Sequence, residues 1–359
     1  MISYYNLGPD EPINRIVYAG SHDAGITSGS SNVQTQFTDV FGQAKTGVRL
    51  FDLRIAAMST GDKTGGAKTA QLRAFHADGL LKKDETKTRF MPELGRTETI
   101  TRTKLRGGGF GLTLDTILAG ARVFVENEGA SEFLMLKFDK CTNWPLIAEA
   151  CVNVLGDAIY TGGGNLNKKT QRDLRGKVIV LFMPEGLEAV QRDFPPKSGV
   201  LGIRNLAGGD PYEEDFDGLQ YYGKGGTSPF KPFMKISQNV KKQKKLMKKG
   251  GHGNPEVMGM MYWTTTGLFE SIHDRNETMW TAPNKAKLRA LWNRGMGDSI
   301  KAAAPDNVDL DSFAAGSVIK TFMPNFVMID FADANKCDEI YQLNNVPATE
   351  LVGLDDAAD

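Results

Sequence analysis

Near its N-terminus the chain reads Arg15-Ile-Val-Tyr-Ala-Gly-Ser-His-Asp-Ala-Gly-Ile26, a short apolar run followed at once by three polar residues. Similar runs are Gly47-Val-Arg-Leu-Phe-Asp-Leu-Arg-Ile55 and Leu72-Arg-Ala-Phe-His-Ala-Asp-Gly79. Short apolar runs bounded by glycine and polar residues predict buried strands. We expect them over 16–19, 48–55 and 72–76. Each carries polar side chains at its carboxyl end, which is the end where a barrel of parallel strands has its active site.

The chain contains four histidines, and two of them, His22 and His76, lie at the ends of these runs. Between them comes Asp52-Leu-Arg54, whose two charged side chains would share one face of a strand. Two imidazoles beside a guanidinium are what acid–base cleavage of a phosphodiester requires. One imidazole takes a proton from the attacking oxygen, the other protonates the leaving oxygen, and the guanidinium neutralises the phosphoryl charge. The alternative is that each histidine is structural.

These segments resemble the X-domain of bacterial phosphatidylinositol-specific phospholipase C. The matching motifs are Ser-His-Asp-Ala-Gly from Ser21, Val-Arg-Leu-Phe-Asp-Leu-Arg from Val48 and Phe-His-Ala-Asp-Gly from Phe75, in that family's order and spacing. Weaker similarity continues through 132–139, 174–182 and 325–331. The resemblance implies cleavage of phosphatidylinositol, by attack of its own 2-hydroxyl, to diacylglycerol and a cyclic inositol phosphate. It also implies an irregular TIM barrel.

The coarse pattern of the chain favours the same α/β architecture. Strand-like runs lie near residues 17, 50, 74, 135, 180, 220, 261 and 328, and through the central half they alternate with helical patterns. One such helix has Thr113 as its cap and an apolar stripe over 114–124. We therefore expect an irregular (β/α)8-type barrel over residues 1–345 as a single domain with long loop insertions, followed by an acidic tail over 346–359.

Catalytic roles follow from the resemblance. His22 would be the base toward the 2-hydroxyl, His76 the acid toward the diacylglycerol oxygen, and Arg54 the clamp on the phosphate. Carboxylates would orient these groups: Asp330 for His22, Asp23 for His76 and Asp52 for Arg54.

The resemblance also assigns residues to the head group. Lys137 would contact the inositol hydroxyls or the phosphate, or would instead simply pair with Asp139. Tyr221 or Tyr222 corresponds to the aromatic residue on which the ring rests. This chain departs from the family twice, with Met183-Pro184-Glu185 where an arginine is usual, and with Leu219 or Gln220 where an aspartate precedes the tyrosine. A related hydroxylated phosphodiester is thus an alternative substrate.

The composition is that of an ordinary globular protein, with 359 residues, 24% charged and 40% hydrophobic, and a formal net charge of zero. No pull toward nucleic acid is indicated. Cys141, Cys151 and Cys337 are odd in number and widely spaced, which predicts buried free thiols. No signal peptide or membrane span is visible. We expect a soluble monomer, cytoplasmic or exported, that acts peripherally on membranes.

Two long segments have no assigned role. Residues 80–111 show little periodicity and are expected to form a loop, basic between Lys82 and Arg106. Residues 239–249 are rich in lysine and follow Phe230, Phe233 and Met234, so they would either dock on anionic lipid or form a solvated face.

Three other readings compete with the phospholipase. A glycerophosphodiester or sphingomyelinase D type of barrel would hold a metal through Glu-x-Asp on its second strand, where this chain has Asp52-Leu-Arg54. A silent X-domain that only binds inositol lipids would lack a histidine, and a purely interfacial protein would rely on 239–249. Since arginine is not a metal ligand and already supplies a positive charge, the sequence predicts an enzyme with no cofactor and no metal.

Overall fold

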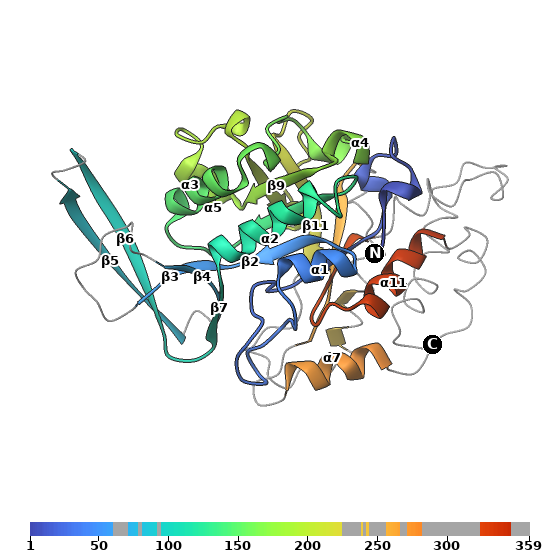
Figure 1. Cartoon of the computed structure of the whole chain (residues 1–359), viewed down its shortest axis with the longest axis horizontal. Helices are drawn as coiled ribbons and strands as arrows, with labels where there is room; N and C mark the ends of the chain where they lie inside the picture. Colours follow the sequence, from blue (N-terminus) through green and yellow to red (C-terminus); the bar gives the residue numbers. More distant parts are fainter. Residues whose placement is uncertain are drawn as a thin grey trace.

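The computed structural model describes residues 1–59, 71–77, 81–91, 95–224, 238–239, 242–243, 256–265, 271–281 and 324–345. Eight parallel strands form a closed barrel in the spatial order β1-β13-β12-β11-β10-β9-β8-β2 (Figure 1). Their bounds are β1 Tyr18–Ser21, β2 Val48–Leu53, β8 Phe133–Phe138, β9 Lys177–Phe182, β10 Val200–Asn205, β11 Gly218–Lys224, β12 Met258–Trp263 and β13 Pro324–Ile329. The α/β barrel that the sequence predicts is confirmed.

Alternation of side chains explains why these runs are apolar throughout. On β8, Phe133 and Met135 pack in the barrel interior, whereas Leu134, Leu136 and Phe138 pack outward against the helices. A strand of a parallel barrel is buried on both faces, so it needs apolar residues at every position. Lys137, near the carboxyl end of this strand, is a buried polar exception.

Helices surround the barrel, and their bounds are α1 Val40–Thr46, α2 Leu114–Glu126, α3 Trp144–Leu155, α4 Gln171–Leu174, α5 Pro184–Val190, α7 Ile272–Thr281 and α11 Ala334–Gln342. The predicted helix after Thr113 is confirmed as α2. The Thr113 side chain accepts a hydrogen bond from the backbone N–H of Thr116, and the face with Ile117, Ala121 and Phe124 is buried. Short 3-10 helices lie at Tyr5–Leu7, Ile13–Arg15, Gly156–Ala158, Leu166–Lys168, Pro196–Ser198, Leu206–Gly208 and Leu343–Asn345.

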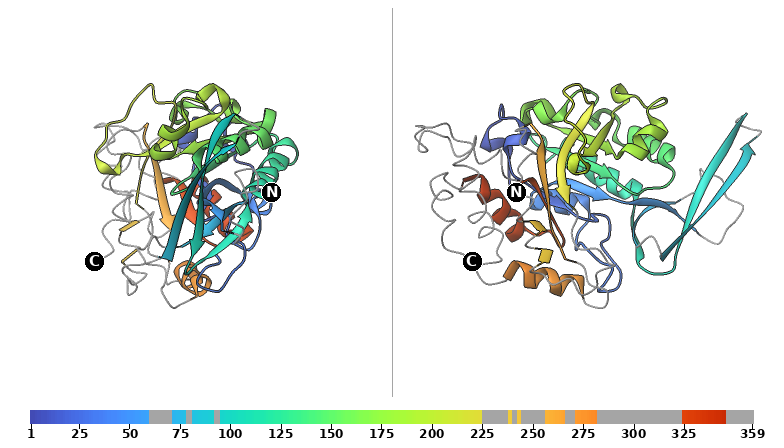
Figure 2. Two further views of the ribbon diagram at one scale, coloured as in Figure 1. Left: turned by 90° about the vertical axis from the view of Figure 1, so that its left-hand side faces the viewer. Right: turned by 180° about the vertical axis from the view of Figure 1, so that it is seen from behind.

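A second sheet projects from the barrel and differs from our expectation. Its strand order is β5-β6-β3-β4-β7, and Figures 1 and 2 show it extending to one side of the barrel. The bounds are β3 Ile55–Met58, β4 Leu72–His76, β5 Lys82–Met91, β6 Arg96–Leu105 and β7 Gly109–Thr113. The strand near residue 74 therefore exists, but it is not a barrel strand.

Two sequence predictions are corrected by this arrangement. Residues 80–111 are not a long loop, because β5 and β6 pair in an antiparallel ribbon over ten residues each. The barrel position that we gave to 72–76 belongs to β10, which we missed within an irregular region. The strand was missed because Gly202 interrupts its apolar run. A glycine is needed at this position because a Cβ there would lie 2.6 Å from the ring of Phe216. The lysine-rich run and the acidic tail lie almost wholly outside the described residues.

The amino end of the barrel is closed by a buried ion pair. Arg49 of β2 lies 3.0 Å from Glu132, and both side chains are fully buried. Arg49 also donates to the carbonyl oxygens of Ala44, Val48 and Ile2, and Glu132 accepts from the side chain of Ser3. The pair thus attaches the first residues of the chain to the barrel.

Removing one member of this pair should be costly, because the other charge would remain buried and uncompensated. We expect Glu132→Gln to lower the free energy of unfolding by about 3–5 kcal/mol. Urea unfolding would measure the change. Glu128→Gln is the matched control: it breaks the exposed Lys45–Glu128 pair and should cost less than about 1 kcal/mol. Equal effects of the two substitutions would contradict this account.

Candidate active site

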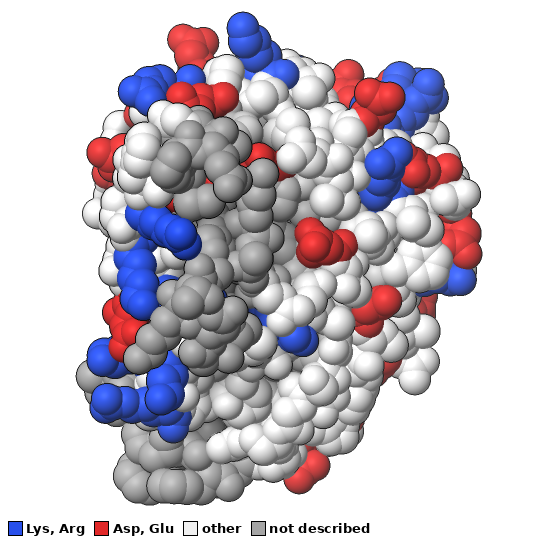
Figure 3. Space-filling model, turned by 60° about the vertical axis from the view of Figure 1, so that its left-hand side comes forward, with Lys and Arg blue, Asp and Glu red and all other residues white. Residues whose placement is uncertain are grey.

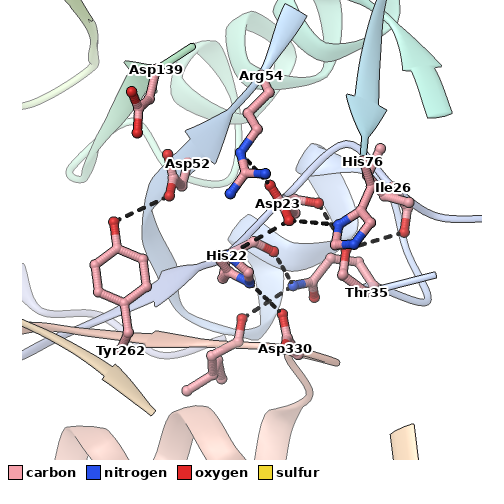
Figure 4. A network of polar contacts seen from close by, with 12 residues as sticks. His22, Asp23, Ile26, Thr35, Asp52, Arg54, His76, Asp139, Tyr262 and Asp330 are labelled. Carbon is pink, nitrogen blue, oxygen red and sulfur yellow. Dashed lines mark hydrogen bonds and ion pairs between the residues drawn. The ribbon is translucent and has the colours of Figure 1, made fainter. Parts of the chain in front are cut away.

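The predicted polar residues meet at the carboxyl end of the barrel (Figure 4). His22 and Asp23 follow β1, Arg54 follows β2, and Asp330 follows β13. His76 reaches the same place from β4 of the second sheet. Strands far apart in sequence therefore contribute one cluster.

His22 is oriented by Asp330. Its Nδ1 lies 2.9 Å from Asp330 Oδ1, and the His22 side chain is 11% exposed. The other oxygen of Asp330 accepts a hydrogen bond from the side chain of Asn276 on α7, at 3.2 Å. The carboxylate is thereby fixed from two sides, and Nε2 of His22 is left free of this contact.

Asp23 links the second histidine to the arginine. Its Oδ2 lies 2.8 Å from His76 Nδ1, and its Oδ1 lies 3.2 Å from Arg54 Nε. The same Oδ2 lies 3.6 Å from His22 Nε2. The pairings of Asp330 with His22 and of Asp23 with His76 are those that the sequence predicts.

The predicted partner of Arg54 is wrong. Asp52 accepts hydrogen bonds from Lys137 Nζ at 2.8 Å and from the Tyr262 hydroxyl at 3.1 Å. The guanidinium of Arg54 instead forms its ion pair with Asp23, although it points toward the space between the two carboxylates (Figure 4). Asp52 and Arg54 share a face of the strand. Asp52 lies deeper in the barrel, however, where its carboxylate pairs with the buried ammonium of Lys137.

The three residues that the sequence predicts to bind the head group, Lys137, Tyr221 and Tyr222, differ in where their side chains lie. Lys137 is 1% exposed in its side chain and contacts Asp52 and, at 3.5 Å, Asp139. Tyr221 belongs to the interior cluster of the barrel. Tyr222 packs outward with the cluster beneath the helices, so it cannot face a ligand in the barrel mouth.

Charge explains the protonation behaviour of the cluster. Burial favours neutral His22, but the carboxylates of Asp23 and Asp330 outweigh it and raise the pKa of His22 to about 9. Burial also opposes ionisation of Asp23, yet Arg54 and His22 hold the pKa of Asp23 well below its usual range. Burial likewise disfavours charged Lys137, and Asp52 nevertheless raises its pKa. The carboxylates and the cations of the cluster therefore favour one another's charged forms and offset the cost of burial.

Several supporting residues were not found from the sequence. Gln36 donates to the carbonyl oxygens of His22 and Ile329 and accepts from the N–H of Ala332, which ties the first strand end to the last. Thr35 donates to the carbonyl oxygen of Asp23. Both lie in a polar stretch that reads as loop, and only their complete burial distinguishes them from solvated residues.

Across the part of the chain that the structure describes, no group of three or more histidine, cysteine, aspartate or glutamate side chains is placed to hold a metal ion. In that same part, no helix has the length and apolar character needed to cross a bilayer. Cys141, Cys151 and Cys337 are buried free thiols, as predicted.

Comparisons with known proteins identify the fold. Models of protein families and curated proteins both give no match. Solved structures do match: a phosphatidylinositol-specific phospholipase C of Staphylococcus aureus has a TM-score of 0.53 at 15% identity, covering 95% of this chain and 96% of that chain. The phosphatidylinositol-specific phospholipase C from Listeria monocytogenes has a TM-score of 0.50 at 12% identity, covering 94% and 96%.

These similarities extend over nearly the whole chain and show that it has the barrel fold of the two bacterial phospholipases. The structural resemblance that the sequence motifs predict is thereby confirmed. At these identities the comparison shows the fold and not the activity.

The electrostatics of His22 can be measured directly. We expect its imidazole to titrate near pH 9 in NMR spectra, because two carboxylates favour its charged form. Asp330→Asn removes one of these charges and should move the titration downward, toward 6.5. Asp338→Asn, an exposed carboxylate on α11, is the matched control and should leave it in place. A titration near 6.5 in the unmodified protein would refute the assignment.

Proposed function

We propose that this protein is a phospholipase C that cleaves phosphatidylinositol without a metal ion. The observation that carries the proposal is the pair of histidines, each with its own carboxylate at 2.8–2.9 Å, beside an arginine at the barrel mouth. Acid–base cleavage of a phosphodiester needs these three groups and no protein nucleophile, because the 2-hydroxyl of the inositol can attack the adjacent phosphorus.

In the first step His22 Nε2 accepts the proton of the 2-hydroxyl while its oxygen forms a bond to phosphorus. The bond from phosphorus to the diacylglycerol oxygen breaks, and His76 Nε2 protonates that oxygen. Each imidazole uses Nε2 because Nδ1 is engaged by a carboxylate, Asp330 or Asp23. These carboxylates fix the ring orientation and stabilise the imidazolium, as the aspartate of a catalytic triad does.

Arg54 would bind the phosphate oxygens. Its Nε contacts Asp23, and none of the residues described by the structure accepts a hydrogen bond from its terminal nitrogens within the site. Those nitrogens can form a bidentate contact with a phosphate, which strengthens as charge builds on the phosphoryl oxygens. A second step would follow: His76 removes a proton from water, the water opens the cyclic phosphate, and His22 protonates the leaving 2-oxygen.

The floor of the site would receive the inositol head group. Asp52, Lys137 and the hydroxyl of Tyr262 form a buried polar group there, and Tyr221 and Leu219 lie in the barrel interior. Leu219 occupies the inward position two residues before Tyr221, where the resemblance would place an aspartate. We therefore propose phosphatidylinositol as substrate, and expect head-group contacts through Asp52 and Tyr262 rather than through that second aspartate.

The first experiment is to incubate the purified protein with phosphatidylinositol and to look for cyclic inositol phosphate and diacylglycerol. We expect His22→Ala and His76→Ala each to lower turnover by about 10²–10⁴-fold, the contribution of a general acid or base. Folding would be checked by circular dichroism. His273→Ala, which removes a partly exposed histidine of α7, is the control. More than about a tenth of the activity remaining in either site variant would show that its assigned role is wrong.

The metal prediction has its own test. We expect full activity in excess EDTA, since the Arg54 guanidinium would supply the positive charge beside the phosphate. Arg54→Lys should lose most activity, because an ammonium cannot hold two oxygens in one plane. Arg73→Lys on β4 is the matched control, since Arg73 donates to the Gly111 carbonyl oxygen and has no assigned role. Activity that disappears with EDTA and returns with calcium would overturn the proposal.

A further inference from the structure

The ribbon of β5 and β6, residues 82–91 and 96–105, forms an arm on the active-site side of the molecule. β6 pairs with β3, and β3 begins at Ile55, two residues after β2 ends at Leu53. The arm is thus built out from the carboxyl end of a barrel strand, and Figures 1 and 2 show it reaching well beyond the barrel. It belongs to the same sheet as β4, the strand that ends in His76.

One face of the arm is strongly basic. In an antiparallel ribbon, directly opposed residues share a face, and the register pairs Lys83 with Lys104, Glu85 with Arg102, Lys87 with Ile100 and Arg89 with Glu98. This charged face carries five basic and two acidic side chains, a net charge of +3 in a chain whose total is zero. Figure 3 shows Lys and Arg side chains following one another down the side of the molecule from which the arm projects.

Part of this charge is balanced within the arm, since Lys83 lies 3.1 Å from Glu85, and the register opposes Glu85 to Arg102 and Arg89 to Glu98. Lys83 and Lys104 are directly opposed, and like charges in that position destabilise a ribbon. On the opposite face Thr86 bonds Thr101 at 2.9 Å and Thr88 bonds Thr99 at 3.0 Å. The excess of positive charge on the other face favours a negatively charged partner.

Apolar side chains accompany this charge. Phe90, at the far end of β5, is 59% exposed, and Leu81, at the base of the arm, is 41% exposed. Phe37, in the loop between β1 and α1 on the same side of the barrel, is 56% exposed. Three of the five large apolar residues that are exposed among the described ones therefore lie on the arm or at the barrel mouth.

We propose that the arm is a docking surface for an anionic phospholipid bilayer. Basic residues near such a surface attract acidic head groups, and an exposed aromatic ring enters the boundary between head groups and acyl chains. Phe90 is paired with Thr97 and so lies on the threonine face, but it is the chain neighbour of Arg89 at the far end of β5. The twist of a two-stranded ribbon turns its two faces toward different directions along its length, so both residues can contact one bilayer. Pairing of β5 with a second copy is disfavoured, because charged side chains along an edge strand oppose it.

The position of the arm gives the docking a use, which rests on the proposed function. The barrel mouth and the arm share one sheet through β3 and β4, so a bilayer bound by the arm lies beside His76. A phospholipid would then move from the bilayer into the site without crossing bulk water. The arm is a membrane contact separate from the lysine-rich segment 239–249, most of which lies outside the described residues.

The test compares two variants that lose equal charge. The arm variant carries Lys83→Gln, Lys87→Gln, Arg89→Gln and Lys104→Gln. The control variant carries the same replacement at residues that precede barrel strands at the opposite end: Lys168, Arg175, Arg192 and Lys197. Cosedimentation would use vesicles of equal parts phosphatidylcholine and phosphatidylglycerol at low salt. We expect binding of the arm variant to fall by at least about tenfold and that of the control to change little.

Two further measurements separate the possibilities. Phe90→Ser should weaken vesicle binding at high salt as well, because salt screens charge and not apolar insertion. Turnover of a water-soluble cyclic inositol phosphate should be unchanged in the arm variant.

Equal losses in the two charge variants, unchanged binding of the arm variant, or binding of an oligonucleotide in place of vesicles would each overturn the docking proposal. Arm-dependent vesicle binding by a protein that leaves phosphatidylinositol intact would support the docking surface and refute only the proposed activity.

Discussion

The carboxylate of Asp23 holds the site together. It lies within 3.6 Å of all three groups that the proposed chemistry needs: His22 Nε2, Arg54 Nε and His76 Nδ1. Its backbone adopts a positive φ of 43°, a conformation that aspartate tolerates better than most residues. Neighbouring bonds enforce it, since Ala24 donates to the carbonyl oxygen of Asp52 and Thr35 donates to that of Asp23. The turn after β1 therefore sets the geometry of the whole cluster.

This turn also explains the second sheet. His22 comes from the barrel, whereas His76 comes from β4, which lies outside it. The barrel and the second sheet, which carry the two histidines, meet at the Asp23 carboxylate and therefore need a rigid connection. β3 provides this connection, because it continues the path of β2 and pairs with β4, while β4 pairs with β7 directly before α2. The departure from a regular barrel is thus the means by which the second histidine reaches Asp23.

The sequence could predict which residues gather at the barrel mouth because local order determines them. A strand end followed by His22-Asp23, or by Asp330, places polar side chains at the barrel mouth whatever surrounds them. It could not predict which carboxylate pairs with which cation. Asp52 and Arg54 share a strand face, but Lys137 and Tyr262 arrive from β8 and β12 and take Asp52. Asn276 and Gln36 were missed for the same reason, since only tertiary contacts give an isolated amide its role.

The same difference between local sequence and tertiary contacts decides which parts of the fold could be predicted. Apolar runs identified most barrel strands, because burial on both faces requires them. The strands of the arm, Lys-Lys-Asp-Glu-Thr-Lys-Thr-Arg-Phe-Met91 and its partner, bury little and carry no apolar alternation. They are held by backbone pairing and by threonine contacts across the ribbon. A register of that kind becomes visible only when both strands are in place.

Charge balance gives Arg54 two functions. Four carboxylates converge at the barrel mouth: Asp23, Asp52, Asp139 and Asp330. Arg54 and Lys137 offset half of their charge, and the remainder favours the protonated form of His22, which a base must lose before it can act. A bound phosphodiester would add one more negative charge and hold that proton more firmly. Arg54 opposes this, because its positive charge lowers the pKa of His22. In the proposed mechanism the guanidinium that would bind the phosphate would also help to keep His22 available as a base, so a substitution of Arg54 would affect both functions at once.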